Sequence, residues 1–362
     1  MTDVAIRRLD YLDALRGVAV LLVLLVHTQE LAPDIKLPST IFNFVNTSKY
    51  GVQLFFEISA FTIFYTLKKT GSTAADFYIK RFFRIAPLYF VALLFFAVWY
   101  KSPTAGILIN GIFLHGFSPK YINSIVPGGW SVGIEMLFYL IAPFLFSKIK
   151  NLGQAIFFLN ITLTFRFLIN YGVSSFHLLQ DSAGQSYYYF WLPNQLPLFA
   201  LGIIVYFIIS DDRLKKEDLL KPATHFIFIW LFSLMTMLSI IQEHIIAGFI
   251  WALLIILLSN LNSSLLVNKI TLFMGKISYS VYLSQYAVIL ILKDIGYVKV
   301  INRSSVLFDL VNFGINYLIL AFICTGISYL LFIMIERPFQ KFGRTLINML
   351  KPQAAELPVK TV

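Results

Sequence analysis

The chain has 362 residues, of which 58% are hydrophobic and only 13% are charged, and its mean hydropathy is +0.77. This composition excludes an ordinary soluble domain and predicts an all-α, polytopic membrane protein surrounded by the lipid bilayer. The net charge of +11 has no aromatic-basic surface motif beside it, so no nucleic-acid partner is expected. A single cysteine, Cys324, excludes an intrachain disulfide.

About ten segments are long and apolar enough to span a bilayer. They lie near residues 15–33, 51–67, 84–100, 131–147, 154–170, 189–209, 224–241, 244–261, 277–293 and 307–335. Residues 104–117 are too few for a span and predict a short re-entrant or interfacial piece.

The basic residues test this count, because they favour cytoplasmic loops. With ten spans and a cytoplasmic N-terminus, twenty Lys and Arg lie inside and seven outside, whereas an eleventh span at 104–117 gives eleven inside and sixteen outside. The sequence therefore predicts ten spans with both termini cytoplasmic. Residues 1–345 are expected to form a single transmembrane domain and residues 346–362 a cytoplasmic tail.

The first span carries an ionisable residue, His27, within an otherwise apolar run. Such a residue is costly to hold in lipid, so the default interpretation is a functional group that faces a cavity. Arg16 precedes it by three helical turns, which places both residues on one face, roughly 16 Å apart along the axis. They are too far apart to touch, and the spacing predicts contacts with opposite ends of one long substrate.

Arg81 and Arg84 stand at the cytoplasmic start of the third span. They are one helical turn apart, so both guanidinium groups can converge on one phosphate or pyrophosphate. The alternative is an anchor that only sets orientation, and the spacing alone slightly favours it.

The turn Pro127–Ser131 precedes the fourth span and predicts Ser131 as the helix N-cap. Glu135 follows one turn into that helix, where the helix dipole favours its ionised form. It is predicted to orient or charge-balance an imidazole in the outer half of the bundle. The alternative is a carboxylate at a helix end exposed to water.

Two further spans contain polar residues. Glu57 lies in the second span, where an acidic residue indicates a functional role. The alternative is a structural role as the partner of Arg16 or Arg166. Two prolines flank Asn194 and Gln195 and predict an interrupted sixth span. The other histidines have no functional pattern, and no His, Asp or Glu spacing resembles a metal site.

Six motifs occur in a recognisable order. They are Leu-Asp-Ala-Leu-Arg-Gly followed by His27, Phe-Phe-x-x-Ser-x-Phe, Arg-Phe-Phe-Arg-Ile-x-Pro-Leu-Tyr, Trp-Ser-x-x-x-Glu-x-x-Phe-Tyr, Gly-Lys-Ile-Ser-Tyr-Ser-Val-Tyr-Leu and Glu-Arg-Pro. This order resembles the acyltransferase-3 family of bacterial membrane O-acyltransferases, which includes O-antigen and exopolysaccharide acetylases. The resemblance extends over about residues 9–344. It implies a ten-helix bundle that moves an acyl group from cytoplasmic acyl-CoA to a hydroxyl, commonly of a sugar, on the outer side.

The family's motif residues fall on positions already singled out. They are Arg16, His27, Arg81, Arg84, Trp130, Ser131 and Glu135. Three positions depart from the family pattern: Ala60 replaces a glycine, Glu57 an apolar residue, and Gln285 a histidine. The last departure leaves His27 as the single candidate base.

The predicted activity is O-acyl transfer, with acetyl-CoA as the expected donor and a glycan or lipid-linked sugar as acceptor, in the bacterial inner membrane. His27 would act as general base or carry the acyl group itself, and Glu135 would hold its imidazole. Arg81 and Arg84 would bind CoA phosphates, with Arg16 binding the donor deeper in the bundle.

Four more residues are predicted to bind substrate. They are Ser59, Trp130, Ser131 and Tyr139. No metal and no permanently bound cofactor are expected.

The alternative function is that of a proton-coupled transporter or flippase of a lipid or sugar, in which His27, Glu57 and Glu135 form a proton path. The lack of a visible inverted repeat argues against it.

Overall fold

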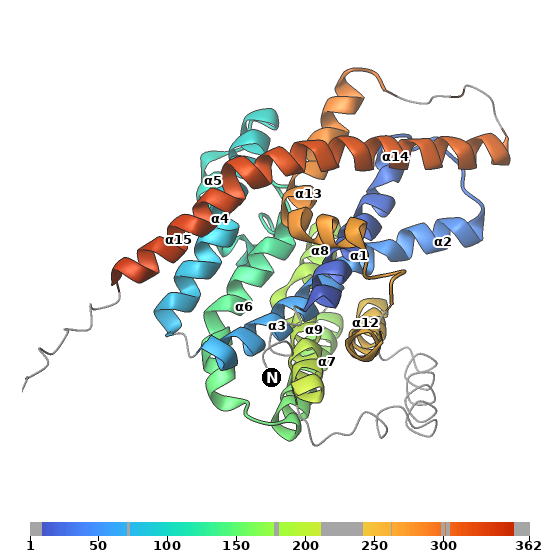
Figure 1. The fold of residues 1–362 in the computed structure, drawn as a ribbon. Helices are drawn as coiled ribbons and strands as arrows, with labels where there is room; N and C mark the ends of the chain where they lie inside the picture. Colours follow the sequence, from blue (N-terminus) through green and yellow to red (C-terminus); the bar gives the residue numbers. More distant parts are fainter. Residues whose placement is uncertain are drawn as a thin grey trace, which may run out of the picture.

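The computed structural model describes residues 9–70, 73–176, 181–210, 242–261, 263–297, 301 and 305–350. Within these ranges every regular element is a helix, so the all-α prediction is confirmed (Figure 1). The elements before the gap at 211–241 are α1 (Asp10–His27), η1 (Thr28–Glu30), α2 (Ser39–Thr47), η2 (Ser48–Tyr50), α3 (Gly51–Thr70), α4 (Ala74–Trp99), α5 (Thr104–Gly111), η3 (Leu114–Phe117), α6 (Gly129–Lys148), α7 (Leu152–Ser175), α8 (Ser182–Phe190) and α9 (Leu192–Ser210). Those after it are α12 (Glu243–Asn260), α13 (Lys269–Asp294), α14 (Val306–Leu331), the π-helical η4 (Phe332–Glu336) and α15 (Arg337–Leu350).

Eight helical segments in the described ranges are long and apolar enough to cross a membrane. They match eight of the predicted spans. The predicted span 277–293 lies in α13, a long helix that is more polar because Ser280, Ser284 and Gln285 face the interior. The predicted span 224–241 lies outside the described residues. The count of ten therefore stays a prediction.

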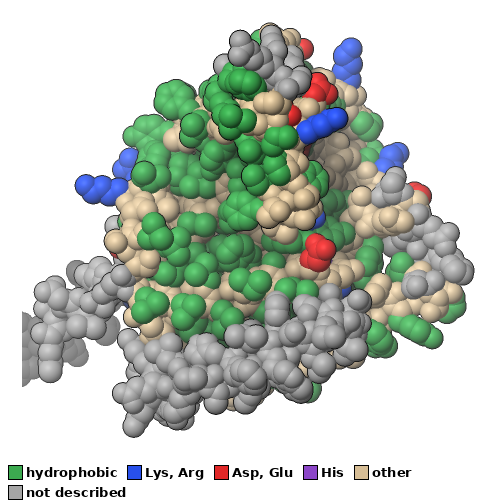
Figure 2. All heavy atoms as spheres, turned by 90° about the vertical axis from the view of Figure 1, so that its right-hand side faces the viewer, with side chains coloured by type: hydrophobic (Ala, Val, Ile, Leu, Met, Phe, Trp, Pro, Cys, Tyr) green, Lys and Arg blue, Asp and Glu red, His purple; other side chains and the backbone are tan. Residues whose placement is uncertain are grey.

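Apolar side chains cover much of the outer surface, as expected for helices in contact with lipid. Figure 2 shows one such face, on which charged side chains are few. Phe157 on α7 and Phe322 on α14 are among the large apolar residues that are mostly exposed. This surface fits a membrane protein and leaves the polar groups to the interior.

The α1 and α13 backbones cross in direct contact at two glycines. A Cβ atom on Gly17 would lie 2.0 Å from the Thr271 carbonyl oxygen, and one on Gly275 would lie 1.8 Å from that of Asp13. Only glycine therefore permits this crossing, as in other membrane helix pairs. The crossing fixes the position of the α1 backbone at Gly17, next to Arg16.

Several helix boundaries differ from the prediction. The α6 helix begins at Gly129 after Gly128, whose φ of 77° favours glycine, so the prediction of Ser131 as N-cap is wrong. His27 is the last residue of α1 rather than a residue in mid-span. The prolines near Asn194 do interrupt the sixth span, since α8 ends at Phe190 and α9 begins at Leu192. The α15 helix extends to Leu350, and the predicted division into a domain and a tail at residue 345 stays a prediction.

Candidate functional site

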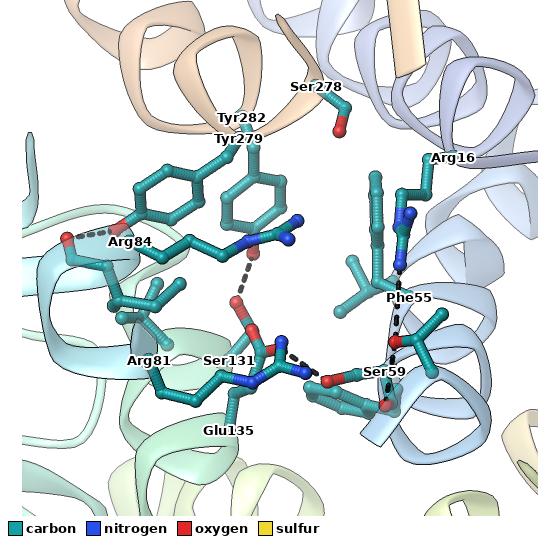
Figure 3. Close-up of a pocket in the computed structure, with 15 residues that line it drawn as sticks. Arg16, Phe55, Ser59, Arg81, Arg84, Ser131, Glu135, Ser278, Tyr279 and Tyr282 are labelled. Carbon is teal, nitrogen blue, oxygen red and sulfur yellow. Dashed lines mark hydrogen bonds between the residues drawn. The ribbon is translucent and has the colours of Figure 1, made fainter. Parts of the chain in front are cut away.

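A buried pocket lies where α1, α3, α4, α6 and α13 meet, and we name it the arginine pocket (Figure 3). Its polar lining includes Arg16, Ser59, Arg81, Arg84, Ser131 and Glu135. Figure 3 shows the Arg81 and Arg84 side chains extending from one wall and Arg16 from the opposite wall. Three cations thus face one carboxylate, an arrangement that favours an anionic ligand.

Two of the three arginines are held by neighbours from the helix bundle. Arg16 Nη1 lies 2.6 Å from Asp13 Oδ1, and its Nη2 donates to Thr62 Oγ1 at 3.4 Å. The Arg81 guanidinium lies over the Phe77 and Tyr139 rings, 5.6 and 5.2 Å from their centroids. These contacts fix the charges before any ligand binds.

Glu135 accepts a hydrogen bond from Ser59 Oγ at 2.7 Å and another from the Tyr139 hydroxyl. On the same helix, Ser131 Oγ donates to the Tyr282 hydroxyl at 2.8 Å, and that hydroxyl donates to the Gly128 carbonyl at 2.9 Å. Four of the predicted site residues, Ser59, Ser131, Glu135 and Tyr139, are therefore brought together.

His27 lies at the other end of α1 from Arg16. Its Nδ1 is 2.8 Å from Glu30 Oε1, and the Tyr286 hydroxyl lies 3.0 and 3.1 Å from Nδ1 and Nε2. The imidazole is partly accessible, with 22% of the side chain exposed. A histidine paired with a carboxylate and open on one side has the geometry of a general base.

Three tyrosines on one face of α13 connect the two sites. Tyr279 and Tyr282 line the arginine pocket, and Tyr286, one turn further along, contacts His27. The axial rise from Tyr279 to Tyr286 is about 10 Å. Tyr279 also donates to the Ile85 carbonyl at 2.8 Å, which ties this face to α4.

Residues 9–333 match the family model described as an acyltransferase domain, acyltransferase-3. The chain belongs to the acyltransferase-3 family. It is therefore an O-acyltransferase with membrane-spanning helices. A protein of the Acidianus two-tailed virus that carries the name "putative acetyltransferase" is 25% identical over 253 residues, which are 64% of this chain and 70% of the viral protein. No solved structure matches the chain.

In this acyltransferase the predicted contact between Glu135 and His27 is wrong. Glu135 bonds to Ser59 and Tyr139 in the arginine pocket, and the carboxylate beside His27 is Glu30. The sequence did not indicate how deep these side chains lie in the bundle. Glu135 lies about 9 Å into α6 and Arg84 about 15 Å into α4, so both reach the same pocket in the interior. The two residues were expected near opposite surfaces.

Glu30 and Tyr286 were not found by sequence reasoning. Glu30 could have been found, because a His-x-x-Glu spacing places both side chains on one side of a helical turn. Tyr286 is remote in sequence, and only the repetition of tyrosines along α13 at helical spacing indicates it.

Trp130 and Glu57 do not line the arginine pocket. Trp130 stacks on Phe190 with ring centroids 4.4 Å apart and does not line the pocket. Glu57 faces α12 on another side of α3, and its two carboxylate oxygens have no hydrogen-bond partner among the described residues. Its suggested partners are engaged elsewhere, Arg16 with Asp13 and Arg166 with Asn194.

Proposed function

We propose that this acyltransferase moves an acyl group, acetyl in particular, from acyl-CoA on the cytoplasmic side to a hydroxyl of a glycan or lipid-linked sugar. The observation that carries the proposal is the arrangement along α1. This one helix holds Arg16 in a cation-lined pocket and ends at His27, whose partner Glu30 follows in η1.

The arginine pocket suits the donor. Arginine guanidinium groups recognise phosphate oxygens through paired hydrogen bonds, and three of them face this pocket with one carboxylate. Arg81 and Arg84 would bind the CoA diphosphate, and Arg16 would contact the donor further along. The long pantetheine arm would then follow the α13 tyrosines towards His27, which lies roughly 16 Å from Arg16 along α1.

His27 would perform the proton transfer. Its Nδ1 proton would be directed to the Glu30 carboxylate, which leaves Nε2, 3.1 Å from the Tyr286 hydroxyl, as the nitrogen that accepts a proton. The acceptor hydroxyl attacks the thioester carbonyl carbon while Nε2 takes its proton. The carbon–sulfur bond then breaks, and the imidazolium returns that proton to the CoA thiolate. Glu30 stabilises the imidazolium between these two steps.

The identity of the acyl group and the side of the membrane from which each substrate binds are inferred from the relative and from the basic residues. The name of the viral relative supports an acetyl donor. The excess of basic residues in alternate loops supports cytoplasmic termini, and therefore a donor site that opens to the cytoplasm of a bacterial inner membrane. A sugar hydroxyl would reach His27 from the outer side.

The proposal is tested with purified protein in nanodiscs, radiolabelled acetyl-CoA and a glycolipid extract as acceptor. Release of free CoA together with label in the glycolipid fraction is the expected result. Label on the protein before acceptor is added, released by neutral hydroxylamine, would replace direct transfer by an acyl-histidine relay. Absence of any thioester turnover would contradict the proposed function.

Orientation has its own test. Single cysteines replacing Thr73, Lys120 and Thr345, in a Cys324→Ser background, all lie at exposed positions. Those at 73 and 345 should react with an impermeant maleimide only from the cytoplasmic side, and that at 120 only from the other side. Labelling of all three from one side would contradict the orientation.

A further inference from the structure

A second pocket adjoins the arginine pocket, and we name it the α4–α15 pocket. It shares Arg81 and Arg84 with the first and adds Lys80 from α4 and Gln340 and Arg344 from α15. Four of its lining residues are cations, and no lining residue is acidic. Such a concentration of positive charge favours a ligand with more than one negative group.

The α15 wall of this pocket is fixed against α4, its neighbour in Figure 1. A Cβ atom on Gly343 would lie only 2.9 Å from Phe83 Cβ, so the two helices touch there. Beside it, the Phe83 and Phe342 rings meet edge to face with centroids 5.2 Å apart. Arg344, the next residue, is therefore held beside the α4 cations rather than on a loose tail.

A ladder of polar side chains runs along the same face of α15. Ser280 Oγ donates to Glu336 Oε2 at 2.9 Å, and Gln340 Nε2 donates to Glu336 Oε1 at 3.1 Å. Arg344 follows Gln340 by one turn. Glu336 belongs to the π-helical segment η4, and such segments often mark functional positions. The ladder anchors the start of α15 to α13, and Arg344 lines the pocket one turn beyond it.

The connection between the two pockets determines which part of a bound CoA would lie in which pocket. Arg81 and Arg84 line both pockets, so a diphosphate bound to them has one end in the arginine pocket and the other in the α4–α15 pocket. In CoA the diphosphate joins the pantetheine arm to adenosine 3′-phosphate. If the arm lies in the arginine pocket, the 3′-phosphate lies on the side of Lys80 and Arg344.

We infer that α15 forms the second wall of the donor site and that Arg344 binds the 3′-phosphate of CoA. This inference rests on the proposed function and extends it to a helix at the far end of the chain, beyond the matched residues 9–333. It predicts an enzyme that distinguishes CoA thioesters from those that lack this one phosphate.

The experiment compares acetyl-CoA with acetyl-dephospho-CoA, which lacks only the 3′-phosphate, in the wild type and in Arg344→Gln. A charge-assisted hydrogen bond accounts for about 10- to 100-fold in affinity, so the wild-type KM should be higher by that factor for the dephospho donor. Arg344→Gln should raise the KM for acetyl-CoA to nearly the dephospho value and leave kcat and the dephospho KM unchanged. Lys341→Gln, which removes an exposed charge from α15 outside the pocket, is the matched control and should behave as wild type.

Three outcomes would overturn the inference. Equal KM values for both donors in the wild type would show that the 3′-phosphate is not recognised. A preference that persists in Arg344→Gln would place that recognition elsewhere. A variant that keeps the preference but is no longer stabilised against thermal unfolding in detergent by added phosphatidylglycerol would assign Arg344 to lipid phosphate. Failure of the wild type to use either donor would instead contradict the proposed function, and this inference with it.

Discussion

The arginine pocket and the His27 site differ in how they are built. Residues from five helices form the pocket, and its cations are held by rings and hydroxyls that are distant in sequence. The His27 site depends on two residues three positions apart, at the end of one helix, and on one tyrosine from another. Recognition of a large anion needs many converging groups, whereas proton transfer needs one oriented imidazole. Substitutions at the two sites should therefore affect different kinetic constants.

The largest effect is expected from His27→Ala. It removes the base, and positioned bases contribute about 100- to 10,000-fold to the rate. kcat for acetyl transfer should fall by that factor while the protein still elutes as a monodisperse species in detergent. Near-normal turnover in the purified variant would contradict the role of His27.

Arg84 should act on the donor instead. Arg84→Ala should raise the KM for acetyl-CoA by about 10- to 100-fold, and Arg84→Lys by less, because lysine keeps the charge but loses the planar fork. Lys69→Ala, which removes an exposed charge outside both pockets, is the control and should change neither constant. If lysine replaces Arg84 with no change in KM, the residue is only an orientation anchor.

Two glutamates distinguish the two sites further. The sequence predicted Glu135 as the carboxylate beside His27, and the structure has Glu30 there. Glu30→Gln should lower kcat by about 10- to 100-fold, as the imidazole loses the carboxylate that fixes its tautomer. Glu135→Gln should change mainly the KM for acetyl-CoA, because Glu135 contacts Ser59 and Tyr139 in the donor pocket. The reverse pattern would restore Glu135 as the partner of His27.

The smallest effect concerns His115, which is buried, whereas His27 is partly accessible. Burial lowers the pKa of His115 to about 4, because the imidazolium is disfavoured away from water, and the hydrogen bond to the Gly129 carbonyl offsets part of this. The unfolded chain binds this proton near its ordinary pKa of 6.5, so its contribution to stability is complete above that pH and declines as the pH falls. The loss is about 2 kcal/mol at pH 5.

Thermal unfolding in detergent at pH 7.5 and 5.0 measures this effect. His115→Asn should be less stable than the wild type at pH 7.5 but lose less of its stability on going to pH 5.0. An equal loss in both proteins would mean that the pKa of His115 is the same in the folded and unfolded states.

Local spacing in the sequence predicted much of this architecture, and long-range packing decided the rest. The spacing of Arg81 and Arg84 predicted that their side chains can converge, and both line one pocket, since both belong to one helix face. The partner of His27 could not be deduced in the same way, because Tyr286 reaches it only through the crossing of α1 and α13 at Gly17 and Gly275.

The same limit explains other differences. The predicted span 277–293 is more polar than the other spans, because the polar side of α13 is buried against its neighbours rather than exposed to lipid. The sequence also did not predict that Arg344 lines a pocket. It depends on how α15 packs on α4, which no spacing within α15 reveals.

The central claim is that donor binding and proton transfer are separate functions of two sites joined by α1. The most direct test measures acetyl-CoA affinity by calorimetry for the wild type, His27→Ala and Arg84→Ala in the same nanodiscs. The account predicts that His27→Ala binds within about twofold of the wild type although it has lost turnover, and that Arg84→Ala binds at least about tenfold more weakly. Loss of acetyl-CoA binding in His27→Ala, with unchanged binding in Arg84→Ala, would contradict it.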